Sequence, residues 1–149
     1  MRQEVNPRVD RIIVAIARAV ALRVPEPRVL HLGCGDGHYA KLLSPFFDVQ
    51  VAVEPRVENW TRYGLRTLFD ELLITEIADV PMGDIEGFSL TILSQPMQVM
   101  SDRNHDIIKR IKCACSVGLM TSLYVSPWFP ELTEVYSDHD GTGCYVIWP

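Results

Sequence analysis

Short apolar runs alternate with helical stripes of apolar residues along this chain. Val9, Ile13 and Val20 recur with helical spacing, and Asn6 and Pro7 supply a cap residue and a proline suited to the first helical position. Further helices are expected at 38–43, at 57–63 and from 101 to about 113. Apolar runs bounded by glycine, proline or polar residues predict strands at 28–32, 49–53, 72–75, 88–93, 117–125, 132–136 and 144–148.

This alternation predicts an α/β protein built on one sheet of seven mostly parallel strands. The last two runs are joined by the polar and glycine-containing stretch 137–143, which predicts an antiparallel hairpin and therefore an antiparallel last strand. A chain of 149 residues is long enough for one core and too short for two. We expect a single domain over 1–149, with an N-terminal helix in 1–27 and the core in 28–149.

A glycine-rich turn follows the first predicted strand. Gly33, Gly35 and Gly37 occupy alternate positions, and glycine both tolerates positive φ and lets backbone N–H groups approach a ligand closely. A helix that begins directly after the turn presents its positive end to that ligand. The dinucleotide-binding pattern needs glycine where this chain has His38, which disfavours a nicotinamide or flavin site. A glycine turn without a ligand remains the structural alternative.

An acidic residue, Glu54, ends the second predicted strand. In a parallel sheet this strand lies beside the one that carries the glycine turn. A carboxylate at that point can accept hydrogen bonds from both hydroxyls of a ribose. The glycine turn and Glu54 together therefore indicate a nucleoside-containing ligand.

The glycine turn and Glu54 resemble the signature of the class I S-adenosylmethionine-dependent methyltransferases. That signature is a hydrophobic strand with an acidic residue, G-x-G-x-G, and an acid at the end of the next strand. The resemblance implies a Rossmann-like fold and S-adenosyl-L-methionine as cofactor. It places the three glycines along the methionine part and Glu54 at the ribose. The chain departs from the family at His31, where Asp or Glu is usual near the amino group of the cofactor.

The resemblance also assigns residues that follow the third predicted strand. Glu76 stands where the family commonly has an acid that holds the adenine amino group, and Ile77 where an apolar residue packs on the ring. The pair suits a purine, which has an apolar face and a donor edge. Alternatively, Glu76 begins a loop and has no such role.

The tip of the fourth predicted strand carries information about the methyl acceptor. Methyltransferases of this family that act on amino groups have [DNS]-P-P-[YFW] there. Here Ser94 and Pro96 agree with the pattern, whereas Gln95 and Met97 do not. Methylation of nucleic-acid amino groups is therefore weakly supported, and no catalytic residue is identified. Ser94 and Gln95 are weak candidates for the acceptor pocket.

The net charge of −5 conceals an asymmetry along the chain. Residues 1–28 hold six arginines and three acids, whereas 29–149 hold eight basic and sixteen acidic residues. A general affinity for nucleic acid is therefore disfavoured. The first helix can still carry a local basic face, the alternative being a merely solvated one.

Cysteine and histidine spacing fits no standard metal site, so no metal is expected. Cys113, Cys115 and His105 come nearest, but buried reduced thiols are the simpler interpretation. His139 lies between two aspartates and could act as a base, although a polar hairpin turn describes it equally well. No apolar run reaches the ~18 residues of a membrane span, so a cytoplasmic protein without membrane contact is expected.

Two connections between predicted strands are short for parallel crossovers, 76–87 and 126–131. Reduced helices on one sheet face would leave apolar strand residues exposed, because a parallel sheet needs cover on both faces. We therefore expect a second copy or a partner subunit on this face, with Trp128 and Phe129 as anchors. The alternative is that the two links cover the face themselves.

Two hypotheses about function follow. The first is a methyltransferase that passes the methyl group of S-adenosylmethionine to an unidentified acceptor by direct displacement. The second is a catalytically degenerate methyltransferase-like fold that serves as an interaction or assembly subunit. Small size, His31, the incomplete motif at Ser94 and the reduced helices favour the second.

Overall fold

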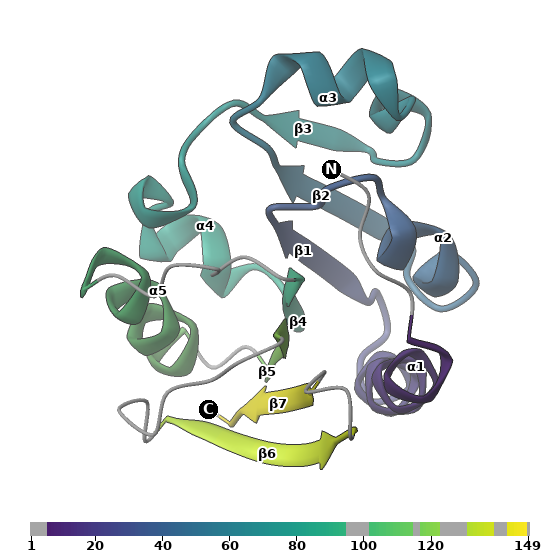
Figure 1. The fold of residues 1–149 in the computed structure, drawn as a ribbon, viewed down its shortest axis with the longest axis vertical. Helices are drawn as coiled ribbons and strands as arrows, with labels where there is room; N and C mark the ends of the chain where they lie inside the picture. The colour runs from purple at the N-terminus through teal and green to yellow at the C-terminus, as the bar shows by residue number, and fades with distance from the viewer. Residues whose placement is uncertain (1–5, 95–101, 115–116, 123–130, 139–142, 149) are drawn as a thin grey trace.

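The computed structural model describes residues 6–94, 102–114, 117–122, 131–138 and 143–148. It contains one seven-stranded sheet with the strand order β3-β2-β1-β4-β5-β7-β6 (Figure 1). The strands are β1 (Arg28–Leu32), β2 (Val49–Val53), β3 (Glu71–Leu73), β4 (Leu90–Ser94), β5 (Val117–Ser122), β6 (Leu132–Ser137) and β7 (Gly143–Ile147). Each predicted strand is present, with the third, fourth and seventh shifted by one or two residues; positions 123–125 of the fifth prediction lie outside the described residues.

Strand β7 runs antiparallel to both of its neighbours, β5 and β6, whereas the pairs among β1 to β5 are parallel. The prediction of a mostly parallel sheet with an antiparallel last strand is therefore confirmed. Strands β1 and β4 lie side by side in the middle of the sheet. From β1 the strand order continues to β2 and β3, and from β4 it continues in the opposite direction to β5, β7 and β6, so the order reverses between β1 and β4. Ligands of open α/β sheets bind at the carboxyl ends of strands at such a point.

Helices α1 (Pro7–Ala21), α2 (His38–Leu43) and α3 (Val57–Arg62) cover one face of the sheet (Figure 1). The predicted cap is confirmed, since Asn6 Oδ1 accepts hydrogen bonds from the backbone N–H of Arg8 at 3.1 Å and of Val9 at 3.3 Å. The predicted apolar stripe of α1 also faces inward, with Val9 and Ile13 buried. A 3-10 turn, η1 (Leu65–Thr67), follows α3 after Gly64, whose φ of 60° ends that helix.

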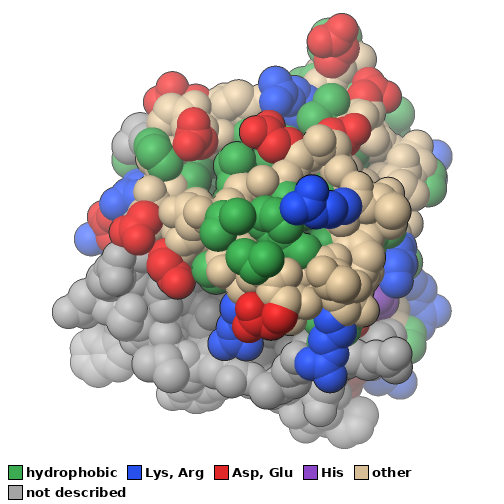
Figure 2. Space-filling model, turned by 90° about the horizontal axis from the view of Figure 1, so that it is seen from above, with side chains coloured by type: hydrophobic (Ala, Val, Ile, Leu, Met, Phe, Trp, Pro, Cys, Tyr) green, Lys and Arg blue, Asp and Glu red, His purple; other side chains and the backbone are tan. Residues whose placement is uncertain are grey.

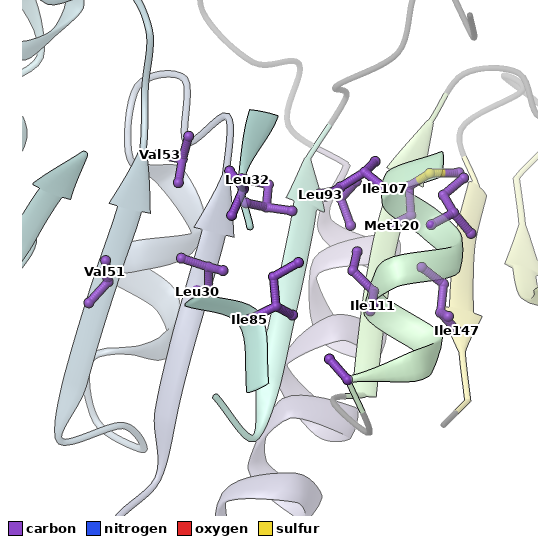
Figure 3. Close-up of a cluster of buried hydrophobic side chains, with 13 residues drawn as sticks. Leu30, Leu32, Val51, Val53, Ile85, Leu93, Ile107, Ile111, Met120 and Ile147 are labelled. Atoms are coloured by element: carbon purple, nitrogen blue, oxygen red, sulfur yellow. The ribbon is translucent and has the colours of Figure 1, made fainter. Parts of the chain in front are cut away.

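The opposite face is covered by η2 (Ile77–Asp79), α4 (Met82–Glu86) and α5 (Asp102–Cys113). Figure 3 shows the side chains that fill the space between the sheet and these helices. Seven of the described strand residues on this face are buried, and others, such as Leu73 at its edge, are partly buried. The buried ones are Leu30, Leu32, Val51, Val53, Leu93, Met120 and Ile147.

The predicted exposure of this face is therefore wrong. Although the link between β3 and β4 forms only η2 and α4, it places Val80 and Ile85 in the core, where three isoleucines of α5 meet them. Arg110 of α5 fastens the link by donating from Nη1 to the carbonyl of Val80 at 2.7 Å. The proposed anchors Trp128 and Phe129 lie outside the described residues, so a partner at these positions remains a prediction.

His31 is a polar member of the core beneath α2. Its Nε2 lies 2.7 Å from Gln50 Oε1, and Gln50 Nε2 donates to the carbonyl of Ala40 at 2.9 Å. Because Gln50 uses its amide N–H toward Ala40, its oxygen faces His31 and accepts from Nε2–H. Phe69 packs edge-on at 5.1 Å between ring centroids. Burial lowers the pKa of His31 to about 4, although the bond to Gln50 acts in the opposite direction.

The buried imidazole makes stability depend on pH. In the unfolded chain a histidine gains its proton near pH 6.5, whereas folded His31 stays neutral until about pH 4. The unfolded state therefore binds more protons in this interval. We expect His31 to account for the loss of on the order of 3 kcal/mol of unfolding free energy between pH 7 and pH 4. Urea titrations of the native protein and His31→Gln should show a flatter pH dependence for the variant; equal slopes would contradict this assignment.

The cover provided by α4 can be tested with two matched truncations. Ile85 is 0% exposed, whereas Ile74, just after β3, is 60% exposed. Ile85→Ala should lower the unfolding free energy by about 2 to 4 kcal/mol, since it leaves a cavity in the core. Ile74→Ala should change it by less than about 0.5 kcal/mol. Urea denaturation measures both, and equal effects would mean that α4 does not seal this face.

Candidate functional site

The glycine turn joins β1 to α2 in a conformation that favours glycine at three positions. The φ angles are 73° at Gly33, 56° at Gly35 and 80° at Gly37, all in the left-handed region. The N–H of Gly37 donates to the carbonyl of Cys34 at 3.0 Å, which closes the turn. The N–H of Gly33 donates to the carbonyl of Val53 at 2.9 Å, which ties the turn to the end of β2.

The three glycines have different surroundings. A Cβ on Gly33 would lie 2.9 Å from Cδ1 of Ile77, and one on Gly37 would lie 2.5 Å from Cδ1 of Leu68. A Cβ on Gly35 would meet no atom within 4 Å. Two glycines therefore allow neighbouring elements to approach the turn, and at Gly35 the backbone borders open space that a ligand can enter.

Glu54 directly follows β2 and lies beside this turn. Its side chain is 5% exposed, and its backbone N–H donates to the carbonyl of Leu73 at the end of β3 at 3.0 Å. Oε2 accepts a hydrogen bond from the N–H of Arg56 at 3.1 Å. Within the part of the chain that the structure describes, no group donates to Oε1. A largely buried carboxylate oxygen is thus available to an outside donor.

The two residues predicted to contact adenine, Glu76 and Ile77, are placed differently. Ile77 is partly buried in η2, and its side chain lies against Gly33. Glu76 is exposed and precedes η2, with its carbonyl accepting from the N–H of Asp79 at 3.0 Å. The fold therefore brings the glycine turn, Glu54 and Ile77 to one edge of the sheet, with Glu76 next to them on the surface.

Apolar side chains at this end of the sheet are exposed. Val57, which begins α3 after β2, is 50% exposed, and Ile74, which follows β3, is 60% exposed. Figure 2 views the molecule from the side of α3 and β3 and shows hydrophobic side chains gathered in the middle of that face, with charged side chains around them. The segments beyond β2 and β3 thus offer apolar surface next to the polar Glu54.

Three other residues were predicted to belong to the site: His31, Ser94 and Gln95. The Nε2 of His31 is bonded to Gln50 beneath α2, as set out above. Ser94 ends β4, where its backbone pairs with Thr121 of β5. Gln95 lies outside the described residues, so the acceptor pocket stays a prediction.

A polar pair beside the turn was not predicted. His38, the first residue of α2, has its Nε2 2.7 Å from Oδ2 of Asp10 in α1, and its N–H donates to Oδ1 of Asp36 at 3.1 Å. Twenty-eight residues separate the two members of the pair, so no local spacing announces the contact. In the sequence His38 was notable only for replacing a glycine.

Cys34 lies within the glycine turn and is 4% exposed. Burial raises the pKa of its thiol to about 12, and the negative charge of Glu54 adds to this effect. Cys34 is therefore a neutral thiol at physiological pH. Among the described residues, no three His, Cys, Asp or Glu side chains gather as metal ligands would. In the same part of the chain, no helix has the length and apolar character required to cross a bilayer.

No protein-family model and no curated protein sequence matches this chain. Solved structures do match its fold. N-methyltransferase NodS from Bradyrhizobium japonicum WM9, in complex with S-adenosyl-L-homocysteine, is 14% identical, with a TM-score of 0.65 over 95% of this chain and 88% of NodS. An RNA methyltransferase from Salinibacter ruber, also in complex with S-adenosyl-L-homocysteine, is 14% identical, with a TM-score of 0.65 over 97% of this chain and 92% of that protein.

A third matching structure belongs to a longer protein. CalS10, an amino pentose methyltransferase from Micromonospora echinaspora solved with bound S-adenosylmethionine, is 13% identical, with a TM-score of 0.61. The match covers 87% of this chain and 57% of CalS10. At these identities the likeness concerns the fold. The chain has the fold of the class I S-adenosylmethionine-dependent methyltransferases.

Proposed function

We propose that this protein binds S-adenosylmethionine at the carboxyl edge of β1, β2 and β3 and passes its methyl group to an acceptor. The observation that carries the proposal is the buried carboxylate of Glu54, with an oxygen available to an outside donor, beside a backbone turn that borders open space at Gly35. Such a combination suits a ligand that has a hydroxyl-bearing ribose next to a polar chain. Two neighbours in fold were solved with S-adenosyl-L-homocysteine, which supports the same class of ligand.

Each part of the site has a role in this proposal. The turn around Gly35 accommodates the methionine part, since its backbone can be approached closely. Glu54 accepts hydrogen bonds from the ribose hydroxyls. Ile77 and the exposed apolar side chain of Val57 border the adenine, whose amino group lies within reach of Glu76. His31 supports α2, the helix after the turn, through Gln50 and the carbonyl of Ala40 rather than through direct contact with the ligand.

S-adenosylmethionine supplies an electrophilic methyl group on a positively charged sulfur. The protein's contribution is mainly to hold an acceptor in line with that methyl, because correct orientation accounts for much of the rate of a direct displacement. Ser94 at the tip of β4 and the adjoining Gln95 are the proposed acceptor contacts. The place of Ser94 at the end of β4 supports this role, since β4 lies next to β1 at the point where the strand order reverses.

Replacing Glu54 tests the ligand site. Glu54→Ala removes hydrogen bonds to a charged group, each worth about 1.5 to 3 kcal/mol, so affinity for S-adenosylmethionine should fall at least tenfold. The matched control is Glu71→Ala, because Glu71 is an exposed acid at the first position of β3, the strand that pairs with β2. Calorimetric titration of both variants and of the native protein gives the comparison. Unchanged affinity in a folded Glu54→Ala protein would remove the basis of the proposal.

A second experiment separates an enzyme from a degenerate scaffold. The double variant of Ser94→Ala and Gln95→Ala should retain its affinity for S-adenosylhomocysteine yet lose transfer of labelled methyl groups, because it alters acceptor positioning alone. Transfer is measured by offering cell extract and labelled S-adenosylmethionine to each protein. A parallel loss of affinity would place these residues at the cofactor instead. Absence of labelled product from the native protein would favour the scaffold hypothesis.

A further inference from the structure

A hydrogen-bonded network lies beside the glycine turn and has no part in the cofactor contacts proposed above. Asp10, in the first turn of α1, receives a hydrogen bond from His38 at 2.7 Å between Oδ2 and Nε2. Both side chains are mostly buried, with 20% of His38 and 13% of Asp10 exposed. His38 directly follows Gly37, so the pair adjoins the turn itself.

The network continues into the sheet through Tyr39. This residue is 4% exposed, and its hydroxyl interacts with Asp10 and Thr121. Burial raises the pKa of Tyr39, and the negative charge of Asp10 raises it further, so Tyr39 stays protonated. Thr121 in β5 is 2% exposed and pairs in register with Ser94 at the end of β4. The network therefore follows the carboxyl edge of the sheet from β5 and β4 to the glycine turn.

The geometry selects one tautomer of His38. Asp10 is a carboxylate and can only accept, so the nitrogen that faces it, Nε2, carries the hydrogen. The other nitrogen, Nδ1, then holds a free lone pair in the neutral ring. Nδ1 has no hydrogen-bond partner among the described residues. A carboxylate that fixes the tautomer of a histidine and leaves its second nitrogen unengaged is the arrangement of a general base.

We propose that His38 takes the proton that the methyl acceptor loses, with Asp10 as its positioning residue. The inference rests on the proposed function, and it names the acceptor class: a nucleophile that carries a proton, such as a hydroxyl or an amine. The acceptor's electron pair forms the new bond to carbon, the carbon–sulfur bond breaks with its pair retained by sulfur, and the acceptor's proton passes to Nδ1. All atoms and charges are accounted for without another reactant.

The contact between Asp10 and His38 would also be present if its role were only to hold α1 against α2. The test must therefore depend on what lies near Nδ1 of His38. The neutral ring and the carboxylate together carry one negative charge, and the substitution Asp10→Asn brings the charge of the pair to zero. If the pair borders the sulfur, this change weakens binding of the sulfonium but not of the uncharged thioether. The other polar groups around His38 are Asp36 in the turn, Tyr39 and the exposed Lys41 in α2, and Thr121 in β5.

The experiment compares the affinities for S-adenosylmethionine and S-adenosylhomocysteine in the native protein and in Asp10→Asn, whose amide oxygen can still accept from His38. The preference for S-adenosylmethionine should be on the order of tenfold smaller in Asp10→Asn, as expected for the loss of one unit charge several ångströms away. His38→Gln can still donate to Asp10, retains the charge of the carboxylate and should retain the preference of the native protein. The control Arg11→Gln removes a charge on the exposed side of α1 and should keep it.

Nitrogen NMR of the imidazoles supplies a second measurement that needs no ligand. The native protein should show His38 with hydrogen on Nε2 and a free Nδ1, whereas Asp10→Ala should show an average of both tautomers. A ligand preference that is the same in Asp10→Asn as in the native protein, or a hydrogen on Nδ1 of His38, would overturn the inference while leaving the proposed function intact. Failure of both ligands to bind would overturn the proposed function and this inference with it.

Discussion

One backbone hydrogen bond ties the site to the sheet, from the N–H of Gly33 to the carbonyl of Val53 at 2.9 Å. It joins the turn after β1 to the last residue of β2, so that Glu54 emerges directly beside the glycines. Beyond this bond the chain continues with a φ of 73° at Gly33, a conformation that side chains disfavour. Ile77 then packs where a side chain on Gly33 would have been. Strand pairing, turn geometry and the approach of η2 thus depend on one another.

Much of the fold could be predicted from the sequence because local and global signals agree. The apolar runs are nearly continuous where strands are buried on both sides, as in β2, whose one polar residue is Gln50, and the stripe on α1 matches a helix that lies on a sheet. The covering of the second face could not be predicted this way. A five-residue helix, α4, buries Ile85 completely, and whether so short a link reaches the core depends on tertiary contacts such as that of Arg110 with Val80.

The same distinction applies to the candidate site, where local patterns could be predicted from the sequence and contacts between distant residues could not. Glycines at alternate positions and an acid after the next strand are local patterns, and the structure places Gly35 and Glu54 together at one edge. The environment of His31 depends on Gln50, which lies nineteen residues away and has no local signature. The pairing of Asp10 with His38 likewise depends on how α1 lies against α2. Patterns that reside in one turn could be predicted, and pairings that depend on packing could not.

The central claim is that the edge formed by the glycine turn and Glu54 binds an S-adenosyl ligand. Hydrogen–deuterium exchange of the native protein, with and without saturating S-adenosylhomocysteine, tests it most directly, because exchange reports where backbone amides become protected. The account predicts saturable binding with protection concentrated in residues 33–37 and in the segments that follow β2 and β3. Protection centred elsewhere, or no protection at millimolar ligand, would contradict it.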